Sequence, residues 1–279
     1  MKSLALILCL AFFVSCAFDT GVKGHATPSA SLTSLSAGQG SAPASVSRLF
    51  DYSAADGISA AADTVVSGRT LRLLSLNVRE WTRDRDEAGE YYWRRRMEAM
   101  ARMIIDVDPD VICLQEVLPP VARYVPDGYR RAGVGVSHPI FVRDTMKVSR
   151  HTFAVFWEAC TVEGIRIVNV HSRWEQEIVE RTVRQVNGQL TGHDLACGDW
   201  NTGLGSIEAA GLRMQSARSM LGVPESDTFA NFTRAESHGA IDHFFVSGLT
   251  PVSYRMVTDG YGCSRISDHW PIVLDVLLP

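Results

Sequence analysis

The sequence has no large excess of charge of either sign. Its 279 residues carry a formal net charge of −4. Proteins that hold nucleic acid over a broad, non-specific surface are usually strongly basic, so this mild acidity argues against that mode of binding. It does not exclude a nucleic-acid substrate that is held at one site.

Paired cysteines with metal-ligand spacing are also absent. The chain has six cysteines but no Cys-x-x-Cys pair, so a zinc site of that type is not expected. Cys9 and Cys16 fall in the N-terminal leader. An exported chain could oxidise a pair among the others, but their mostly apolar surroundings favour buried thiols. The four cysteines outside the leader are Cys113, Cys160, Cys197 and Cys263.

The N-terminal apolar run is too short to span a bilayer. In "MKSLALILCLAFFVSC", Lys2 precedes an apolar stretch from Leu4 to Val14, which predicts a signal peptide over 1–16. "FVSC" resembles a lipoprotein signal with Cys16 as the lipidated residue and membrane attachment, whereas "SCA" before Phe18 fits an ordinary signal peptidase. Both readings predict export, to the bacterial cell envelope as a lipoprotein or as a secreted or periplasmic protein.

Large apolar residues are scarce over 17–69. "ATPSASLTSLSAGQGSAPAS" is small, polar and interrupted by proline and glycine. Such a segment cannot bury enough surface to offset its ordering entropy, so it is predicted to be a flexible tether. Regular patterns begin at Thr70 and predict one globular domain over 70–279, without internal repeats.

Within this domain, apolar residues recur with the spacings of helices and strands. Trp93, Met97, Met100 and Ile104 step by four, three and four, which predicts one face of a helix that Pro109 ends. Mixed strands and helices favour sheets that are covered by helices. The other predicted elements are a helix over 178–190 and strands over 71–78, 110–117, 151–159, 165–172, 194–201, 240–247 and 271–278.

Polar and charged side chains adjoin several of these strands directly. A carboxylate at the end of a buried strand costs desolvation free energy unless it is paired or bound to a metal. One such residue is ordinarily part of a loop, but six such sites in one domain are hard to explain as solvated loop residues. The sites are Asn77, Glu116, His171, Asp199 with Asn201, Asp242, and Asp268 with His269.

These residue types suit the hydrolysis of phosphate esters. Oxygens of Asp, Glu and Asn are hard ligands that favour Mg²⁺, with Mn²⁺ or Ca²⁺ next. A bound cation reverses the repulsion between carboxylates and a phosphate and neutralises charge as it develops. A carboxylate can then orient or deprotonate water, and an imidazolium can steady the phosphate oxygens or the leaving group.

The same residues stand in motifs whose order and approximate spacing resemble the endonuclease/exonuclease/phosphatase family, the deoxyribonuclease I-like metallophosphoesterases. The resemblance extends from about Leu71 to Leu278. It implies an α+β fold, a four-layer αββα sandwich with two mixed β-sheets packed face to face and helices outside. The motifs are "LNV" at Asn77, "DPDVICLQEV" at Glu116, "VNVH" at His171, "GDWN" at Asp199, "IDHFFVS" at Asp242 and "SDHWPIV" at Asp268.

The resemblance also implies a metal site. By carry-over, Glu116 is the principal ligand of Mg²⁺, and Asn77 lies beside it. Asp268 completes the site directly or through water. Mn²⁺ and Ca²⁺ remain alternatives to Mg²⁺.

Catalytic roles follow from the same resemblance. Asp199 orients or activates the attacking water, and Asn201 holds a phosphate oxygen. His171 contacts the phosphate. His269 is the second catalytic imidazole, and Asp242 fixes its tautomer and raises its pKa.

The segment "HSRW" departs from the usual family pattern and predicts contacts to substrate. Arg173 could clamp a phosphate in bidentate fashion, although a solvated arginine fits equally well. Trp174 is predicted to form an aromatic wall for a base, an inositol ring or a lipid. Trp200 and Trp270 favour core packing.

The sequence thus predicts an exported, divalent-metal-dependent phosphoesterase that acts on phosphodiester or phosphomonoester bonds, with a nuclease among the options. The sequence has no basic stripe and no long hydrophobic loop, which favours a small or single-stranded substrate. A lipid or inositol-phosphate phosphodiesterase is one alternative, and a degenerate member that binds without turnover is another. The chain is expected to be a monomer.

Overall fold

The computed structural model describes residues 68–133, 137–232 and 239–279. The predicted leader with Cys16, and the tether up to residue 67, lie outside the described residues. Within the described ranges, no helix has both the length and the hydropathy needed to cross a membrane.

The first β-sheet, sheet A, joins both ends of the domain. β1 pairs in parallel with β2 and antiparallel with β12, so the last strand of the chain lies beside the first. The spatial order is β11-β12-β1-β2-β4-β3. Its strands are β1 (Thr70–Asn77), β2 (Val111–Gln115), β3 (Tyr129–Arg131), β4 (Ile140–Arg143), β11 (Pro251–Met256) and β12 (Ile272–Leu277).

The second sheet, sheet B, is built from the middle of the chain. β7 and β8 are parallel, and β10 runs antiparallel to β8. The spatial order is β5-β6-β7-β8-β10-β9. Its strands are β5 (Val148–Ala154), β6 (Trp157–Val162), β7 (Ile165–His171), β8 (Asp194–Asp199), β9 (Gln215–Ser216) and β10 (Asp242–Ser247).

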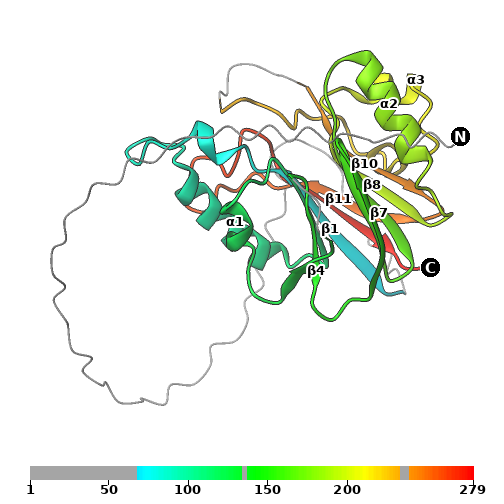
Figure 1. Cartoon of the computed structure of the whole chain (residues 1–279), viewed down its shortest axis with the longest axis horizontal. Helices are drawn as coiled ribbons and strands as arrows, with labels where there is room; N and C mark the ends of the chain where they lie inside the picture. Colours follow the sequence, from blue (N-terminus) through cyan, green and yellow to red (C-terminus); the bar gives the residue numbers. More distant parts are fainter. Residues whose placement is uncertain (1–67, 134–136, 233–238) are drawn as a thin grey trace, which may run out of the picture. The chain divides into compact units, whose positions relative to one another are not determined.

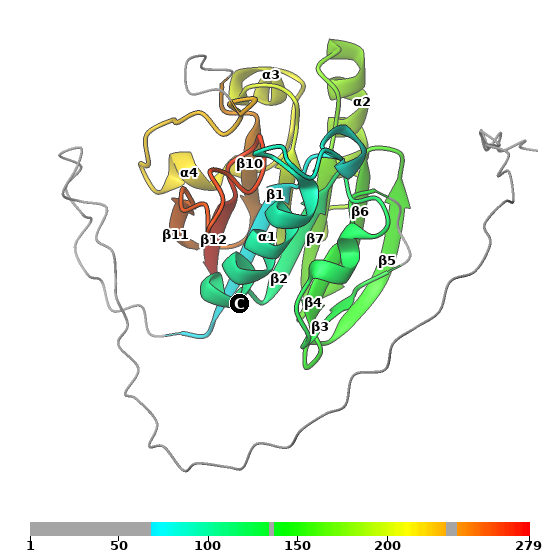
Figure 2. The same ribbon diagram turned by 90° about the vertical axis from the view of Figure 1, so that its left-hand side faces the viewer.

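Helices cover the outer faces of the two sheets, as Figure 1 shows. α1 (Trp93–Val107) packs on sheet A, and Figure 2 shows it in front of β1 and β2. α2 (Gln176–Asn187) and α3 (Leu204–Ala209) pack on sheet B. The predicted four-layer αββα sandwich is confirmed. Shorter elements are η2 (Trp81–Arg83), η3 (Val121–Tyr124) and α4 (Ala217–Met220).

The largest core cluster lies between the sheets. Alternate strand residues such as Leu73, Ile167 and Leu274 face each other there, because side chains alternate between the two faces of a strand. The thiols of Cys113, Cys160 and Cys197 are free and buried, as predicted, whereas Cys263 is only partly buried.

The prediction of one strand over 151–159 is wrong. The chain turns at Val155 and Phe156, so this stretch forms the end of β5 and the start of β6 in a hairpin. "HTFAVFWEA" contains no Gly, Pro, Asn or Asp to signal the turn. The apolar pattern of the predicted strand therefore runs without a break through the turn at Val155 and Phe156.

Strand directions bring the polar residues to one rim of the sandwich. The parallel pairs β1–β2 and β7–β8 each end at this rim. β10 runs the other way, so its first residue Asp242 pairs with the last residue of β8, Asp199. β12 is likewise antiparallel to β1, so Asp268 and His269 precede it at the same rim.

Candidate active site

Glu116 and Asn77 form the sheet A side of the site. Glu116 directly follows β2 with φ of 58°, a left-handed conformation that turns the chain away from the strand direction. The Asn77 side-chain amide donates to Glu116 Oε1 at 3.1 Å and to Asp199 Oδ2 at 3.0 Å. The buried Asn77 therefore ties the rim of sheet A to that of sheet B.

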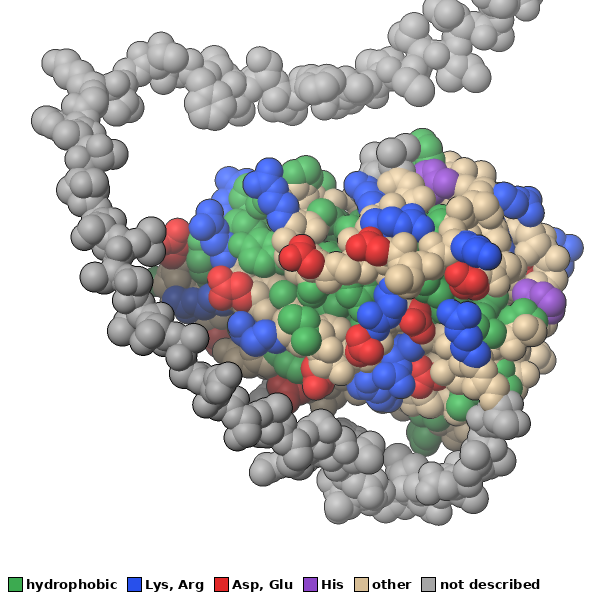
Figure 3. Space-filling model, turned by 90° about the horizontal axis from the view of Figure 1, so that it is seen from below, with side chains coloured by type: hydrophobic (Ala, Val, Ile, Leu, Met, Phe, Trp, Pro, Cys, Tyr) green, Lys and Arg blue, Asp and Glu red, His purple; other side chains and the backbone are tan. Residues whose placement is uncertain are grey.

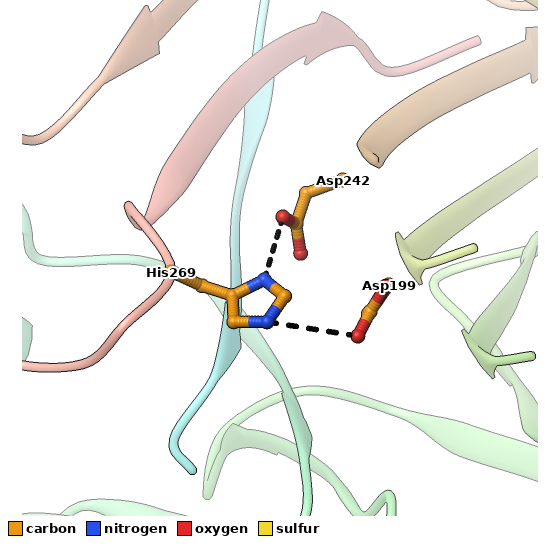
Figure 4. Close-up of side chains that lie close together, drawn as sticks. All are labelled: Asp199, Asp242 and His269. Carbon is orange, nitrogen blue, oxygen red and sulfur yellow. Dashed lines mark hydrogen bonds and ion pairs between the residues drawn. The ribbon is translucent and has the colours of Figure 1, made fainter. Parts of the chain in front are cut away.

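Asp242 and His269 form a close acid–imidazole pair (Figure 4). His269 Nδ1 lies 2.9 Å from Asp242 Oδ2, and its Nε2 lies 3.8 Å from Asp199 Oδ2. All three side chains are buried. Because Asp242 accepts from Nδ1, the other ring nitrogen is left to face Asp199 and the cleft.

The two histidines of the rim have opposite electrostatic surroundings. Burial lowers the pKa of His269, but the carboxylates of Asp242 and Asp199 outweigh it and raise the pKa to about 10. Burial also lowers the pKa of His171, and here it outweighs the nearby carboxylate of Glu116. His269 is thus an imidazolium at neutral pH, whereas His171 is neutral.

Asp199 lies between these histidines. Burial raises the pKa of its carboxyl to about 7, against the opposing charge of His269 and hydrogen bonds from Asn77 and the Asn201 backbone. His171 Nε2 lies 3.7 Å from Asp199 Oδ2. A carboxyl with a pKa near neutrality can both accept and return a proton.

Asn201 holds Asp199 in place. Its backbone N–H donates to Asp199 Oδ1 at 2.8 Å, and its side-chain amide donates to Asp199 Oδ2 at 3.1 Å and to the Ser172 carbonyl at 3.1 Å. The residue has φ of 54°, which bends the chain back over the end of β8. These contacts orient Asp199, and the predicted phosphate contact of Asn201 stays a prediction.

Gly198 explains the first letter of the "GDWN" motif. Its φ of 127° is one that residues with a side chain rarely adopt, and an added Cβ would lie 2.0 Å from the Val170 carbonyl oxygen. Close pairing of β7 with β8 therefore requires glycine directly before Asp199.

We expect Gly198→Ala to lower the free energy of unfolding by about 3 kcal/mol, because backbone strain and steric overlap add. Urea unfolding measures this loss. Gly205→Ala is the control, since a Cβ at Gly205 in α3 would meet nothing within 4 Å. Equal stability of the two variants would contradict the close approach at Val170.

Asp268 is held by an arginine that the sequence analysis did not single out. Arg79 Nη1 lies 2.7 Å from Asp268 Oδ2, and Arg79 Nε lies 2.9 Å from Asp84 Oδ2. The wholly buried Arg96 of α1 also pairs with Asp84, at 2.8 Å. The sequence "LNVRE" places Arg79 near Asn77, but only tertiary contacts reveal the network.

Direct coordination of a metal ion by Asp268 would compete with the hydrogen bonds that its carboxylate already accepts. Its Oδ1 accepts from the Ser267 hydroxyl at 3.1 Å, and its Oδ2 accepts from Arg79. Each oxygen retains a lone pair for a cation or a bound water. The predicted role of Asp268 as a metal ligand stays a prediction.

A cleft of about 690 Å³ opens over these residues. Arg173 and Trp174 line it, as predicted for substrate contacts, and the Trp174 side chain is 72% exposed. Phe156 and Phe229 add aromatic surface. The cleft therefore combines the polar residues of the strand ends with aromatic surface.

The other two tryptophans behave as packing residues. Trp200 is wholly buried and lies against Phe245 with ring centroids 5.3 Å apart. Trp270 is half-buried, and the Arg265 guanidinium lies 4.2 Å from its ring centroid. Neither lines the cleft.

The chemistry of the donor set fits a hard cation near Glu116. Its oxygens accept from neutral donors, the Asn77 amide and the Glu80 backbone N–H at 2.8 Å. The neutral His171 Nε2 lies 3.9 Å away. These contacts leave the negative charge of Glu116 for a cation from the cleft to balance.

A second donor set is less suitable. Ligand atoms of Asp199, Asp242 and His269 lie within 4.8 Å of one another. A cation bound to His269 Nδ1 would have to displace its 2.9 Å hydrogen bond with Asp242. The Glu116 side of the cleft, where Asn77 and Asp199 supply further oxygens, fits a hard cation better, and the predicted metal ligands stay a prediction.

Solved structures with the same fold come from several organisms. A Bacteroides thetaiotaomicron protein of the endonuclease/exonuclease/phosphatase family is 18% identical, with a TM-score of 0.60 over 77% of this chain and 100% of that one. A mannosyl-6-phosphatase of the same organism is 20% identical (TM-score 0.59, 75% and 100%). D. rerio TDP2 complexed with a single-strand DNA product is 17% identical (TM-score 0.59, 75% and 99%). No curated protein matches the sequence.

The sequence itself matches a family description. Residues 88–269 match the endonuclease/exonuclease/phosphatase family, whose enzymes hydrolyse phosphate esters and depend on divalent metals. The match includes Glu116, His171, Asp199, Asn201, Asp242, Asp268 and His269, whereas Asn77, Arg79, Glu80 and Asp84 precede it. The chain belongs to the endonuclease/exonuclease/phosphatase family.

Proposed function

We propose that this protein is an exported, Mg²⁺-dependent phosphoesterase that hydrolyses phosphodiester bonds by attack of water, with phosphomonoesters as the alternative ester. The observation that carries the proposal is the Asp242–His269–Asp199 chain, whose members Asp199 and His269 line one cleft together with Glu116. A binding protein without turnover does not require a buried imidazolium between two carboxylates.

Each polar group has a distinct task in this reaction. Asp199 accepts the proton of the attacking water at its carboxylate, for which a pKa of about 7 is well matched. Asn77 and Asn201 fix the orientation of that carboxylate by their amide hydrogen bonds. A bound Mg²⁺, held by Glu116 and Asn77, would supply charge neutralisation at the phosphate.

The histidines act on the phosphate and the leaving group. His269 Nε2 carries a proton that it can donate to a phosphate or leaving-group oxygen, while Asp242 fixes its tautomer at Nδ1. The neutral His171 contacts the phosphate from the other side of Asp199. Arg173 and Trp174 contact the remainder of the substrate.

Among the solved structures with this fold, there is support for a phosphomonoester and for a phosphodiester substrate. The mannosyl-6-phosphatase indicates a phosphomonoester, and TDP2 with its single-strand DNA product indicates polynucleotide chemistry. The open, aromatic-walled cleft favours a diester with a substituent on each side of the phosphorus. A lipid or inositol-phosphate substrate would use the same catalytic groups.

The proposed location and assembly rest on the sequence. The leader over 1–16 supports export, either anchored through a lipidated Cys16 at the bacterial cell envelope or released as a secreted or periplasmic enzyme. We propose a monomer, because all the side chains invoked in the reaction come from one chain.

Chelation tests the metal dependence directly. We expect hydrolysis of bis(p-nitrophenyl) phosphate in Mg²⁺, loss of hydrolysis on adding EDTA, and recovery on restoring Mg²⁺, measured by release of p-nitrophenolate. Substitution of Mn²⁺ or Ca²⁺ for Mg²⁺ identifies the preferred ion. Absence of turnover with every divalent ion would support the binding protein instead.

A further inference from the structure

Three neighbouring cavities share lining residues at the rim of the sandwich. The active-site cleft shares Arg83, Glu116 and His171 with a cavity of about 300 Å³. That cavity shares Leu118 and Ser137 with a third one of about 410 Å³. We call the three adjoining cavities the groove and the third cavity its distal arm.

The distal arm is lined by cationic and apolar side chains. Residues 117–120, Ala122, Arg123, Arg131 and Ser137 line it; among these described residues two are arginines and none is acidic. Arg131 also interacts with the buried carboxylate of Glu158. Arg123 is exposed on η3. Guanidinium groups bind phosphate oxygens in a bidentate manner, so this lining favours an anion with an apolar neighbour.

Backbone contacts hold the distal arm in shape. The Val117 N–H donates to the Ser137 carbonyl at 2.8 Å, which joins the loop after β2 to the segment before β4. Val121 of η3 is wholly buried, and the Tyr124 ring packs edge-on against Trp93 with centroids 5.9 Å apart. These contacts fix the loop after β2 and η3, so this part of the lining needs less ordering when a ligand binds.

The cleft itself offers aromatic and apolar surface. Trp174 and Val155 line it and are 72% and 77% exposed. Single-stranded nucleic acids bind to grooves that combine cationic side chains for phosphates with aromatic rings for bases. Both features occur among the lining residues of the three adjoining cavities.

A double helix would need a larger cationic surface. Duplex binding draws mainly on an extended cationic face. The face that Figure 3 draws from below carries Lys and Arg side chains interspersed with Asp and Glu side chains, so that face offers a duplex no extended cationic surface. The net charge of −4 agrees with a narrow, local anion site.

We propose that the distal arm binds a second phosphate of a single-stranded polynucleotide whose scissile phosphate lies at the active site. This inference rests on the proposed phosphodiesterase function. It adds that Arg123 and Arg131 select for chain length, because a substrate with a single phosphate leaves the distal arm empty.

Length-dependent kinetics of the full chain test the inference. We would compare a thymidine dinucleotide, which has one phosphodiester, with a thymidine octanucleotide in Mg²⁺. We expect kcat/KM to be higher for the octanucleotide, chiefly through a lower KM. Arg123→Glu should reduce the octanucleotide-to-dinucleotide ratio of kcat/KM by roughly tenfold or more, as for loss of a charged hydrogen bond.

Arg123→Ala and a double variant serve as further checks. Arg123 is exposed, so Arg123→Ala should fold and should reduce the same ratio less strongly than Arg123→Glu. The double variant replaces both Arg123 and Arg131 with alanine. Its control replaces Arg69 and Arg184 with alanine, which removes the same charge from exposed positions outside the groove. Equal reductions in the two double variants would overturn the inference in favour of general electrostatics.

The outcomes separate this inference from the proposed function. If bis(p-nitrophenyl) phosphate and both nucleotides remain intact with every divalent ion, the proposed function itself fails. If the reporter is hydrolysed but the ratio equals one, the distal arm is not a polynucleotide subsite. If hydrolysis appears only with anionic phospholipid vesicles, the polynucleotide inference is overturned in favour of a lipid substrate.

Discussion

Replacing Glu116 with alanine is expected to abolish hydrolysis of bis(p-nitrophenyl) phosphate at limiting Mg²⁺. Glu116 offers the cleft a carboxylate whose hydrogen-bond donors, Asn77 and the Glu80 backbone, are neutral. Removing it takes away the main negative charge available to anchor a cation. The loss in kcat/KM should exceed the ~10–100-fold loss that is usual when a residue that only hydrogen-bonds to a metal ligand is replaced.

The fold should survive this change, because the Glu116 side chain is 23% exposed and the backbone conformation at φ of 58° is present already in the wild type. Glu116→Gln keeps the shape of the side chain and removes only its charge, so it should be nearly as inactive. Titration calorimetry with Mg²⁺ should show weakened binding in both variants. Glu177→Gln, on the exposed first turn of α2, is the control. Wild-type turnover of Glu116→Ala at limiting Mg²⁺ would refute the assignment.

His269→Ala should reduce kcat by a factor on the order of 10²–10⁴, the usual cost of losing an acid–base group. The imidazolium of His269 is held between Asp242 at 2.9 Å and Asp199 at 3.8 Å, so no neighbouring group can take over its proton in the same place. Steady-state kinetics with bis(p-nitrophenyl) phosphate measure the loss.

Two related variants separate the imidazole from its orientation. Asp242→Asn preserves the packing but weakens the hold on His269 Nδ1, so it should cost less than His269→Ala. His193→Ala is the control, because His193 is exposed and lines none of the three groove cavities. If His269→Ala loses less than tenfold, another group must supply the proton.

The sequence carried most of the information on which residues matter. Carboxylates, amides and imidazoles next to buried strands are costly, so Glu116, Asp199 and Asp242 stood out before any fold was known. The αββα architecture likewise followed from the resemblance of the motifs and is confirmed by the two helix-covered sheets. The turn at Val155 was missed because it carries no residue with a strong turn preference.

Distances and protonation states could not be predicted in this way. Asn77 and Asp199 are 122 residues apart in the chain, yet their side chains hydrogen-bond across the two sheets. The ion pair of Arg79 with Asp268 spans 189 residues. Whether an arginine two positions after a strand faces solvent or a distant carboxylate depends on packing that local spacing does not encode.

The sequence alone therefore determined the family, the polar residues that adjoin the strands and the residue types of the site. These features depend on side-chain chemistry and on the regular spacing of apolar residues along the chain. Only the tertiary structure decided that His269 is charged while His171 is neutral, since each pKa reflects burial and the carboxylates nearby. It also decided that a cavity lined by Arg123 and Arg131 lies near the cleft, since cavities arise where separate loops meet.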